Sequence, residues 1–271
     1  MDERLQRRIQ RYGWDEAASV YNDAWADNLR PAHDALLEMA DLFPGLHVVE
    51  AAAGDGLVTF RVAAAVSEKG KVVATDISGE MAAKGATEAK ARGLAQVKFE
   101  RMEAEALTLP DNTFDRAICA LGLMYVPRPE KALSEMARIL RPGGRGTVLV
   151  WGERRNCGWA ELFPITDAEV KSEVCPLFFS LGVPGVLSGA LTQSKFHQVE
   201  ERRITGLMHF ADRESLLRAV IDGGAVALAA KRFTPETRAR VDDAFTASVE
   251  AFRMGSGYEI PGEFVVATGV I

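Results

Sequence analysis

At 271 residues, with 48% hydrophobic and 26% charged residues, the chain has the composition of a globular protein with one elaborated domain. The formal net charge of −6 argues against a surface that coats nucleic acid, because phosphate backbones select an excess of basic residues. The three cysteines, Cys119, Cys157 and Cys175, are far apart and form no CxxC pair. This argues against a disulfide framework or a zinc site and fits a reducing, cytoplasmic setting.

The N-terminal segment is charged from its second residue and has no apolar core, so we expect no signal peptide. We also expect no membrane span, because no stretch approaches the roughly 18 apolar residues that a span needs. Four arginines cluster here, namely Arg4, Arg7, Arg8 and Arg11. We expect a solvated helix face, and contact of these arginines with an anionic membrane surface or a partner is left open.

Helices are predicted before residue 46. Apolar residues recur at spacings of four, three and four, which indicates one helical stripe: Trp14, Ala18, Tyr21 and Trp25. Pro31 suits the first turn of another helix, which the "PG" at 44–45 closes.

From residue 47 to residue 151, apolar runs alternate with helical patterns. The predicted strands are 47–51, 71–77, 96–100, 114–121 and 145–151. The predicted helices are 57–67, 78–92 with Ser78 as its cap, and 129–140 with Pro129 in its first turn. Several strands are continuous apolar runs, which predicts an α/β fold with a parallel sheet covered on both faces. Such sheets bind ligands at the carboxyl ends of their strands.

After residue 151 the alternation stops. Residues 160–195 look irregular, 197–205 predict a strand, 212–254 predict two or three helices, and 262–270 predict a final strand. A helical block between the last two strands would hang over the carboxyl edge of the sheet as a lid. We therefore expect a single domain over residues 1–271. Its parts are N-terminal helices (1–45), a cofactor-binding core (46–151), a variable segment with the sixth strand (152–210), a helical lid (211–256) and the final strand (257–271).

The stretch "VVEAAAGDG", residues 48–56, joins the first predicted strand to the next helix. Gly54 and Gly56 let a ligand approach the backbone without a Cβ clash. A dinucleotide-binding turn needs a third glycine where Thr59 stands. The loop therefore suits a nucleoside ligand that lacks a pyrophosphate, and an ordinary tight turn is the alternative.

Acidic residues follow the next two predicted strands. Asp76 is placed to accept hydrogen bonds from ribose hydroxyls, or alternatively to cap the helix that starts at Ser78. In "MEAEAL", residues 102–107, Glu103 or Glu105 beside a backbone N–H could bind the amino edge of adenine. The alternative for either acid is plain surface charge.

In this order and spacing, the segments "EAAAGDG", "TD", "EAEAL", "FDRAICALGLMYV" and "EMARILRPGG" resemble the class I S-adenosylmethionine-dependent methyltransferases. Within that family the resemblance is to the small-molecule branch that includes the ubiquinone/menaquinone C-methyltransferases, and it is densest over residues 14–151. It implies a Rossmann-like seven-stranded sheet, mostly parallel with an antiparallel last strand, helices on both faces and a helical lid. It also implies S-adenosyl-L-methionine as cofactor and S-adenosyl-L-homocysteine as product.

The resemblance implies a role in cofactor binding for particular positions. Glu50, Ala52, Gly54 and Gly56 would hold the methionine part and Asp76 the ribose. Ile77, Met81, Glu103 and Ala104 would surround the adenine, and the carbonyls of Cys119 to Leu121 would face the amino group. Two residues depart from the family pattern. Ala52 replaces the usual first glycine. Asp55 either places a charge near the cofactor carboxylate or caps the following helix.

Methyl transfer requires a collinear, dry arrangement more than a fixed catalytic group. His209 is the only candidate base that we name, and His33 and His47 are expected to be structural. The candidate walls of the acceptor pocket, for which core packing is the alternative, are Tyr21, Trp25, Met124, Tyr125, Trp151 and Phe210, joined by Phe163 and Phe178. Glu153 and Asn156 are candidate polar groups on its rim.

These patterns favour a methyltransferase acting on a small, partly apolar or aromatic metabolite, with no nucleic-acid partner. A nicotinamide-dependent oxidoreductase and a cofactor-binding module without turnover remain as alternatives. The acceptor atom and the oligomeric state are left open by the sequence.

Overall fold

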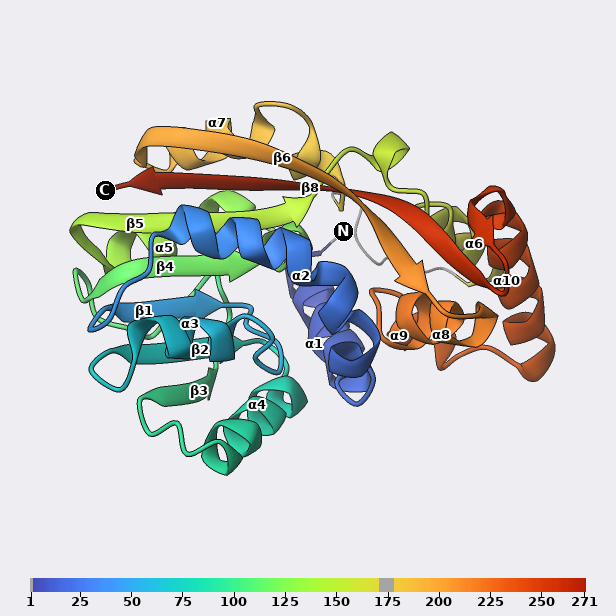
Figure 1. Ribbon diagram of the computed structural model, residues 1–271, viewed down its shortest axis with the longest axis horizontal. Coiled ribbons are helices and arrows are strands. Elements are labelled where there is room, and N and C mark those ends of the chain that lie inside the picture. Colours follow the sequence, from blue (N-terminus) through green and yellow to red (C-terminus); the bar gives the residue numbers. More distant parts are fainter. Residues whose placement is uncertain (1, 171–177) are drawn as a thin grey trace.

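A single sheet organises the molecule (Figure 1), of which the computed structural model describes residues 2–170 and 178–271. The sheet has eight strands in the order β3-β2-β1-β4-β5-β8-β6, with the short β7 paired to β8. Their bounds are β1 His47–Ala51, β2 Lys71–Asp76, β3 Val97–Arg101, β4 Phe114–Ala120, β5 Leu140–Trp151, β6 His197–Phe210, β7 Arg253–Met254 and β8 Gly257–Val270. The strands from β3 to β5 pair in parallel, whereas β8 runs antiparallel to both β5 and β6.

The predicted Rossmann-like sheet, mostly parallel with an antiparallel last strand, is confirmed. The predicted number of seven strands is exceeded by one, because the two-residue β7 folds back on the start of β8. The last two long strands also extend further than predicted, since β6 continues to Phe210 and β8 begins at Gly257. Their extra residues pair with each other, from Gly206 opposite Gly262 to Phe210 opposite Tyr258.

Helices lie on both faces of the sheet and beyond the carboxyl ends of its parallel strands (Figure 1). The α-helices are α1 Glu3–Ala17, α2 Tyr21–Ala40, α3 Thr59–Val66, α4 Gly79–Ala91, α5 Pro129–Ile139, α6 Leu162–Glu169, α7 Val186–Gln193, α8 Arg213–Leu217, α9 Ala227–Ala230 and α10 Pro235–Ser248. A π-helical turn, η4 (Arg218–Asp222), follows α8, and the 3₁₀ turns are η1 (Leu123–Tyr125), η2 (Arg154–Asn156), η3 (Ser180–Gly182) and η5 (Glu250–Phe252). The expectation that 160–195 is irregular was wrong for 160–170 and 178–195, because α6, η3 and α7 lie there, and residues 171–177 of that range lie outside the described residues.

The predicted cap of α4 is present: the Ser78 hydroxyl accepts a hydrogen bond from the Met81 N–H at 3.0 Å. Pro129 is in the first turn of α5, as predicted. Pro31 is different, because it lies inside the 20-residue α2 rather than at a helix start. Pro31 and Asp27, the residue whose carbonyl loses its helical donor, are both exposed. The lost bond therefore falls on the solvent side, where water can replace it.

The N-terminal helical stripe is also interrupted. Trp14 lies on α1, whereas Tyr21 and Trp25 lie on α2, and the chain turns between Ala18 and Val20. The rings meet in space nonetheless, since Trp14 and Tyr21 pack edge to face with their centroids 5.5 Å apart. The periodicity therefore identified residues of one surface but not of one helix.

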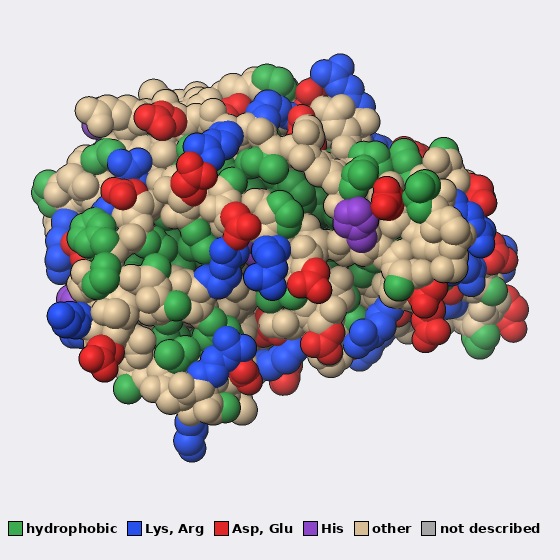
Figure 2. Space-filling model, viewed as in Figure 1, with side chains coloured by type: hydrophobic (Ala, Val, Ile, Leu, Met, Phe, Trp, Pro, Cys, Tyr) green, Lys and Arg blue, Asp and Glu red, His purple; other side chains and the backbone are tan. Residues whose placement is uncertain are grey.

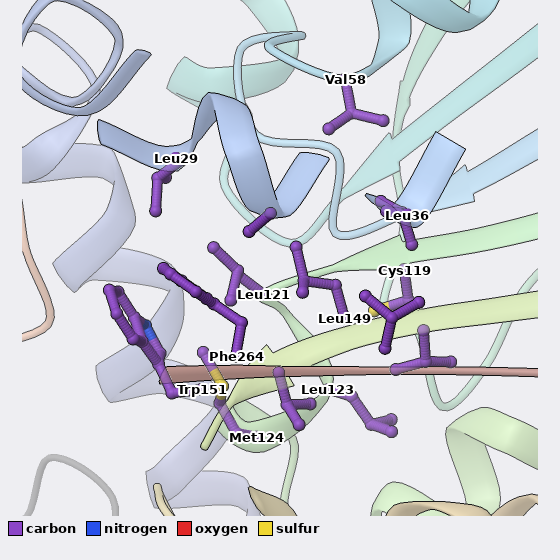
Figure 3. Packing of buried hydrophobic residues seen from close by; sticks show 14 of the residues in the cluster. Leu29, Leu36, Val58, Cys119, Leu121, Leu123, Met124, Leu149, Trp151 and Phe264 are labelled. Atoms are coloured by element: carbon purple, nitrogen blue, oxygen red, sulfur yellow. The ribbon is translucent and has the colours of Figure 1, made fainter. Parts of the chain in front are cut away.

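The core that α2 covers is mostly apolar. Leu36 of α2 lies next to Cys119 and Leu149 on the central strands, whereas Leu29 lies on the side of Leu121 and Trp151 (Figure 3). At the end of β5, Trp151 stacks on Phe264 of β8 with ring centroids 4.3 Å apart. This packing fixes α2 across the sheet, and the amino-terminal part of that helix reaches the carboxyl ends of the strands (Figure 1).

The segment predicted as a lid, residues 211–256, holds α8, η4, α9 and α10. Figure 1 shows these helices beyond the arrowheads of β4 and β5, next to α6 and the start of α2. The expected function of a lid remains a prediction.

The loops that follow β1 and β4 approach each other closely. Ala52 has a left-handed backbone with φ of 55°. A Cβ added to Gly122 would lie 2.2 Å from the Ala52 Cβ, which is closer than two carbon atoms can pack. The methyl group of Ala52 therefore fits because Gly122 has no side chain.

This contact predicts a specific coupling. We expect Gly122→Ala to lower the free energy of unfolding by about 1–3 kcal/mol through overpacking. Adding Ala52→Gly should restore most of that loss, because it removes the opposing methyl. Urea denaturation of the single and double variants measures the coupling. Gly206→Ala is the matched control, since its added Cβ meets no atom within 4 Å. Additive effects of the two substitutions would contradict the contact.

Candidate functional site

One cavity of the described structure opens at the carboxyl ends of β1, β2 and β4. It has about 880 Å³ of empty space, part of it open to solvent, and we call it the first cavity. Its walls come from the loops after these strands and from α1 and α2, including Arg7, Gln10, Trp14, Tyr21 and His33.

Most residues predicted to hold the cofactor line this cavity. They are Glu50, Ala52, Gly54, Asp76, Ile77, Met81, Glu103, Ala104 and Leu121. Gly56 and Cys119 do not line it. Gly56 faces away, since a Cβ there would lie 2.6 Å from the ring of Phe60. The Cys119 side chain is buried beneath the loop, next to Gly122.

Glu50, at the end of β1, is buried. Its Oε2 accepts a hydrogen bond from the Thr59 hydroxyl at 2.6 Å. Burial raises the pKa of Glu50 to about 8, and the Thr59 bond only partly offsets this effect. Thr59 stands where a dinucleotide-binding loop would have its third glycine, so that position here supports the carboxyl group instead.

Asp76, at the end of β2, is also buried and accepts two backbone hydrogen bonds. Gly54 N–H donates to its Oδ2 and Ser78 N–H to its Oδ1, each at 2.8 Å. Burial raises the pKa of Asp76 to about 6 despite these bonds. The α4 cap is Ser78, so Asp76 connects the two loops and retains acceptor capacity toward the cavity.

Asp55 serves neither as a helix cap nor as a wall of the cavity. The residue at the N-cap of α3 is Val58, and no side chain caps that helix. Instead, Asp55 pairs with Lys84 Nζ at 2.9 Å and accepts from Asn22 at 3.4 Å. It thus connects the first loop to α4 and α2, and the cap alternative was wrong.

A charged cluster connects α1 to the loop after β3. Arg7 Nε donates to Glu105 Oε2 at 2.8 Å, and Arg7 Nη2 donates to Glu105 Oε1 at 3.1 Å. The backbone N–H of Arg128 donates to the same buried carboxylate at 3.2 Å. Arg7 also lies 3.6 Å from Glu103. The sequence placed Arg7 on a solvated helix face, because nothing local signals a partner 98 residues away.

A second cavity, with about 460 Å³ of empty space, part of it open to solvent, adjoins the first. The two cavities share four lining residues, which we call the boundary: Trp14, Tyr21, Leu121 and Tyr125. Beyond them the second cavity is lined by aromatic rings, including Trp25, Trp151, Trp159, Phe163 and Phe178. None of its described lining side chains carries a charge.

The predicted acceptor-pocket walls that line this second cavity are Tyr21, Trp25, Tyr125, Trp151, Phe163 and Phe178. Met124 and Phe210 do not line either cavity. Met124 is buried in the short turn η1, and Phe210 packs behind Trp25 with ring centroids 6.2 Å apart. Trp14 and Trp159 were not predicted, because their roles depend on contacts distant in sequence.

The polar candidates lie elsewhere. The His209 side chain is 65% exposed, sits 3.4 Å from Glu259 and lines neither cavity, so it is not placed to act as a base there. Asn156 donates to Glu263 Oε2 at 3.1 Å, and the Glu153 N–H donates to the same oxygen at 2.8 Å. His33, expected to be structural, lines the first cavity, and burial lowers its pKa to about 4.

Within residues 2–170 and 178–271, no three His, Cys, Asp or Glu side chains are grouped so that they could hold a metal ion. In the same ranges no helix combines the length and apolarity needed to cross a bilayer. Cys119 and Cys157 are buried free thiols, and Cys175 lies outside the described residues.

Comparison with known proteins gives consistent matches. A family model described as a methyltransferase domain matches residues 48–144. The ubiquinone/menaquinone biosynthesis C-methyltransferase UbiE of Shewanella frigidimarina (strain NCIMB 400) is 30% identical over 189 residues, which is 69% of each chain. UbiE of Shewanella sp. (strain ANA-3) is 40% identical over 114 residues, which is 42% of this chain but only 45% of that protein. The chain therefore matches less than half the length of the latter relative.

Solved structures share the fold at low sequence identity. Phosphoethanolamine N-methyltransferase 2 of Haemonchus contortus, in complex with S-adenosyl-L-methionine, has a TM-score of 0.62 at 15% identity and covers 94% of this chain and 57% of its own. The [4+2]-cyclase SpnF has a TM-score of 0.57 at 20% identity and covers 89% of this chain and 80% of its own. These likenesses, together with the sequence matches, show that this chain belongs to the class I S-adenosylmethionine-dependent methyltransferase family, within which it is similar to the ubiquinone/menaquinone C-methyltransferases.

Proposed function

We propose that this protein transfers the methyl group of S-adenosylmethionine to a small, partly apolar or aromatic metabolite and releases S-adenosylhomocysteine. One observation carries this proposal: an acidic cavity and an aromatic cavity meet at the boundary residues Trp14, Tyr21, Leu121 and Tyr125. A cofactor held in the first cavity would face an acceptor held in the second across these residues.

The side chains of the first cavity fit the cofactor's functional groups. Burial raises the pKa of the Glu50 carboxyl, with a smaller contribution from nearby Asp76, and the cofactor's ammonium group would supply a compensating positive charge. Asp76 has acceptor capacity for ribose hydroxyls. Ile77, Met81, Glu103 and Ala104 line the same cavity. Ile77 and Met81 would offer apolar contacts to the adenine, and Glu103 with the backbone of Ala104 would bind its edge.

When bound, S-adenosylmethionine supplies an electrophilic methyl group on a positively charged sulfur. The chain contributes orientation and exclusion of water. Trp14 packs edge to face on both Tyr21 and Tyr125, with centroids 5.5 and 5.1 Å apart, so the three rings form a rigid boundary. Aromatic rings of this kind also attract a nearby cation.

Proton transfer has a small role in this proposal. The described lining of the second cavity contains no carboxylate, histidine or lysine. Burial raises the pKa of Tyr21 far above its usual range, so its hydroxyl remains protonated. The rate would therefore depend on how the acceptor is held rather than on a protein base.

The surface and the loop geometry disfavour other functions. Basic and acidic side chains are interspersed over the face in Figure 2, which offers no continuous basic surface for nucleic acid. The Thr59 hydroxyl is committed to Glu50 where a nicotinamide-binding loop would need glycine. A cofactor-binding protein without methyl transfer remains the second candidate, since SpnF, a [4+2]-cyclase, shares this fold.

We further propose a cytoplasmic location for this protein, which suits its buried free thiols.

The proposed function is tested by binding and turnover together. We expect calorimetry to detect S-adenosylmethionine and S-adenosylhomocysteine but not NADH. We expect methyl-labelled cofactor to label at least one member of a panel of small aromatic compounds, with stoichiometric S-adenosylhomocysteine. Binding without labelled product across the panel would support the non-catalytic candidate, and binding of NADH alone would refute the proposal.

The ribose assignment predicts the effect of Asp76→Ala. Removing the carboxylate should weaken cofactor binding by about 1–3 kcal/mol, the usual effect of leaving a polar ligand group unpaired. The matched control is Ser78→Ala, which removes the α4 cap and should lower stability by about 1 kcal/mol with less effect on binding. Equal loss of affinity in both variants would mean that Asp76 acts only through loop structure.

The Glu50 assignment predicts a pH dependence. The free protein holds Glu50 protonated below its pKa of about 8, whereas a bound ammonium group favours the carboxylate. Binding should therefore release a proton between about pH 6 and 7.5, and affinity should rise with pH in that window. Calorimetry in buffers of different ionisation enthalpy measures the proton release. Glu50→Gln should abolish the release at the upper end of this window, where Asp76, with its pKa of about 6, is already ionised, and an unchanged release there would contradict the assignment.

A further inference from the structure

The outer surface of α1 carries two parallel ridges of side chains. Three arginines recur at spacings of four and three and form what we call the basic ridge: Arg4, Arg8 and Arg11. Three apolar residues recur at the same spacings one position later and form the apolar ridge: Leu5, Ile9 and Tyr12. In a helix this spacing aligns each set, and the shift of one position places the two ridges side by side. The buried residues of α1 are Gln6, Gln10 and Ala17, so both ridges lie away from the side that faces the protein.

The basic ridge lacks counter-charges. Among the described residues, none of its three arginines has a carboxylate within ion-pair distance, and neither does Arg232, which follows α9. Of the other described arginines, all except Arg101 and Arg145 have a carboxylate partner. A chain with a net charge of −6 therefore gathers unpaired cations at one place.

The apolar ridge borders an open groove between α1 and α9, which lie beside each other in Figure 1. The groove has about 1020 Å³ of empty space, part of it open to solvent. The apolar ridge and Arg8 line it from α1, whereas Leu228 and Arg232 line it from α9 and the residues that follow. Glu16, the acidic residue in its described lining, is paired with Lys231. Tyr12 is 47% exposed. The apolar ridge is therefore accessible and has an unpaired arginine on each side.

This pattern indicates what covers the ridges. An exposed apolar strip with arginines on both sides matches the interface of an anionic membrane, where a helix lies parallel to the surface. Guanidinium groups bind the phosphates of the head groups, and the apolar side chains reach the start of the acyl chains. Nucleic acid would match the arginines but not the apolar ridge. A polypeptide would need acidic and apolar residues in register with both ridges, whereas a fluid lipid surface supplies both groups in any register.

We propose that α1 docks this protein onto the anionic surface of a membrane. The basic ridge and Arg232 contact the head groups, and the apolar ridge enters the interface. This contact is peripheral, and it goes beyond the proposed function without depending on it. The arginines of the basic ridge line neither the first nor the second cavity, so their replacement leaves the walls of both cavities intact.

Vesicle binding of the full chain tests the proposal. Sedimentation with phosphatidylcholine vesicles is compared with sedimentation with vesicles in which about a third of the lipid is phosphatidylglycerol. We expect the protein to partition onto the anionic vesicles at least about tenfold more strongly, because each arginine near such a surface adds to the attraction. Raising the salt concentration should release it, since salt screens these charges.

The variant Arg4→Gln/Arg8→Gln/Arg11→Gln removes the basic ridge. We expect its partition coefficient on anionic vesicles to fall at least about tenfold. The matched control is Arg154→Gln/Arg155→Gln/Arg253→Gln, which removes the same charge from η2 and β7 and should retain binding within about twofold of the wild type. Ile9→Gln should weaken binding about threefold or more while its salt dependence is kept, because it removes apolar contact and no charge.

Thermal unfolding checks that each variant is folded. If the triple α1 variant does not fold, hydrogen exchange of the wild-type protein replaces it, and anionic vesicles should slow exchange in α1 but not in α10. Equal partition onto both kinds of vesicle, or an equal loss of binding in the two triple variants, would overturn the proposal. Binding to polyglutamate without binding to anionic vesicles would also overturn it and would indicate an acidic protein partner instead.

Discussion

Two carboxyl groups buried at the ends of neighbouring parallel strands are the constraint on which the rest of the site depends. Glu50 and Asp76 are kept from water, and their pKa values are raised to about 8 and about 6. Burial of this kind is unfavourable for the free protein, and the surrounding loops compensate only in part, through Thr59, Gly54 and Ser78. The arrangement becomes favourable when a ligand brings a cation and hydroxyl groups to these carboxyls.

The helices that precede the sheet, α1 and α2, border the first and second cavities at the carboxyl edge of the sheet. Along α2, side chains four residues apart face the site, with Tyr21 on the boundary, Trp25 and Leu29 in the second cavity and His33 in the first. The bonds from Arg7 to Glu105 hold α1 against the loop after β3, and so keep Trp14 on the boundary. Helices α1 and α2 therefore separate the acidic first cavity from the aromatic second cavity.

The parallel core could be predicted from local patterns in the sequence, because apolar runs identified β1 and β2. An acid at the end of β2 pointed to Asp76, whereas Glu50 and most other residues of the cofactor cavity were predicted through the resemblance to a known family. The remaining features depend on distant contacts that no local pattern contains. Arg7 pairs across 98 residues, Trp159 reaches the cavity from a segment without periodicity, and Pro31 lies inside a helix since its missing donor faces solvent. His209 was a wrong candidate because the extended β6 carries it to the surface.

The central claim is that the cofactor and the acceptor occupy the two cavities on either side of the boundary. A crystal structure with S-adenosylhomocysteine bound tests it most directly. We predict that the amino group lies near Glu50, the ribose near Asp76, and the sulfur at the boundary formed by Trp14, Tyr21, Leu121 and Tyr125, facing the aromatic cavity. A sulfur that instead points away from these residues, toward the rim formed by Arg7 and Glu103, would contradict the account.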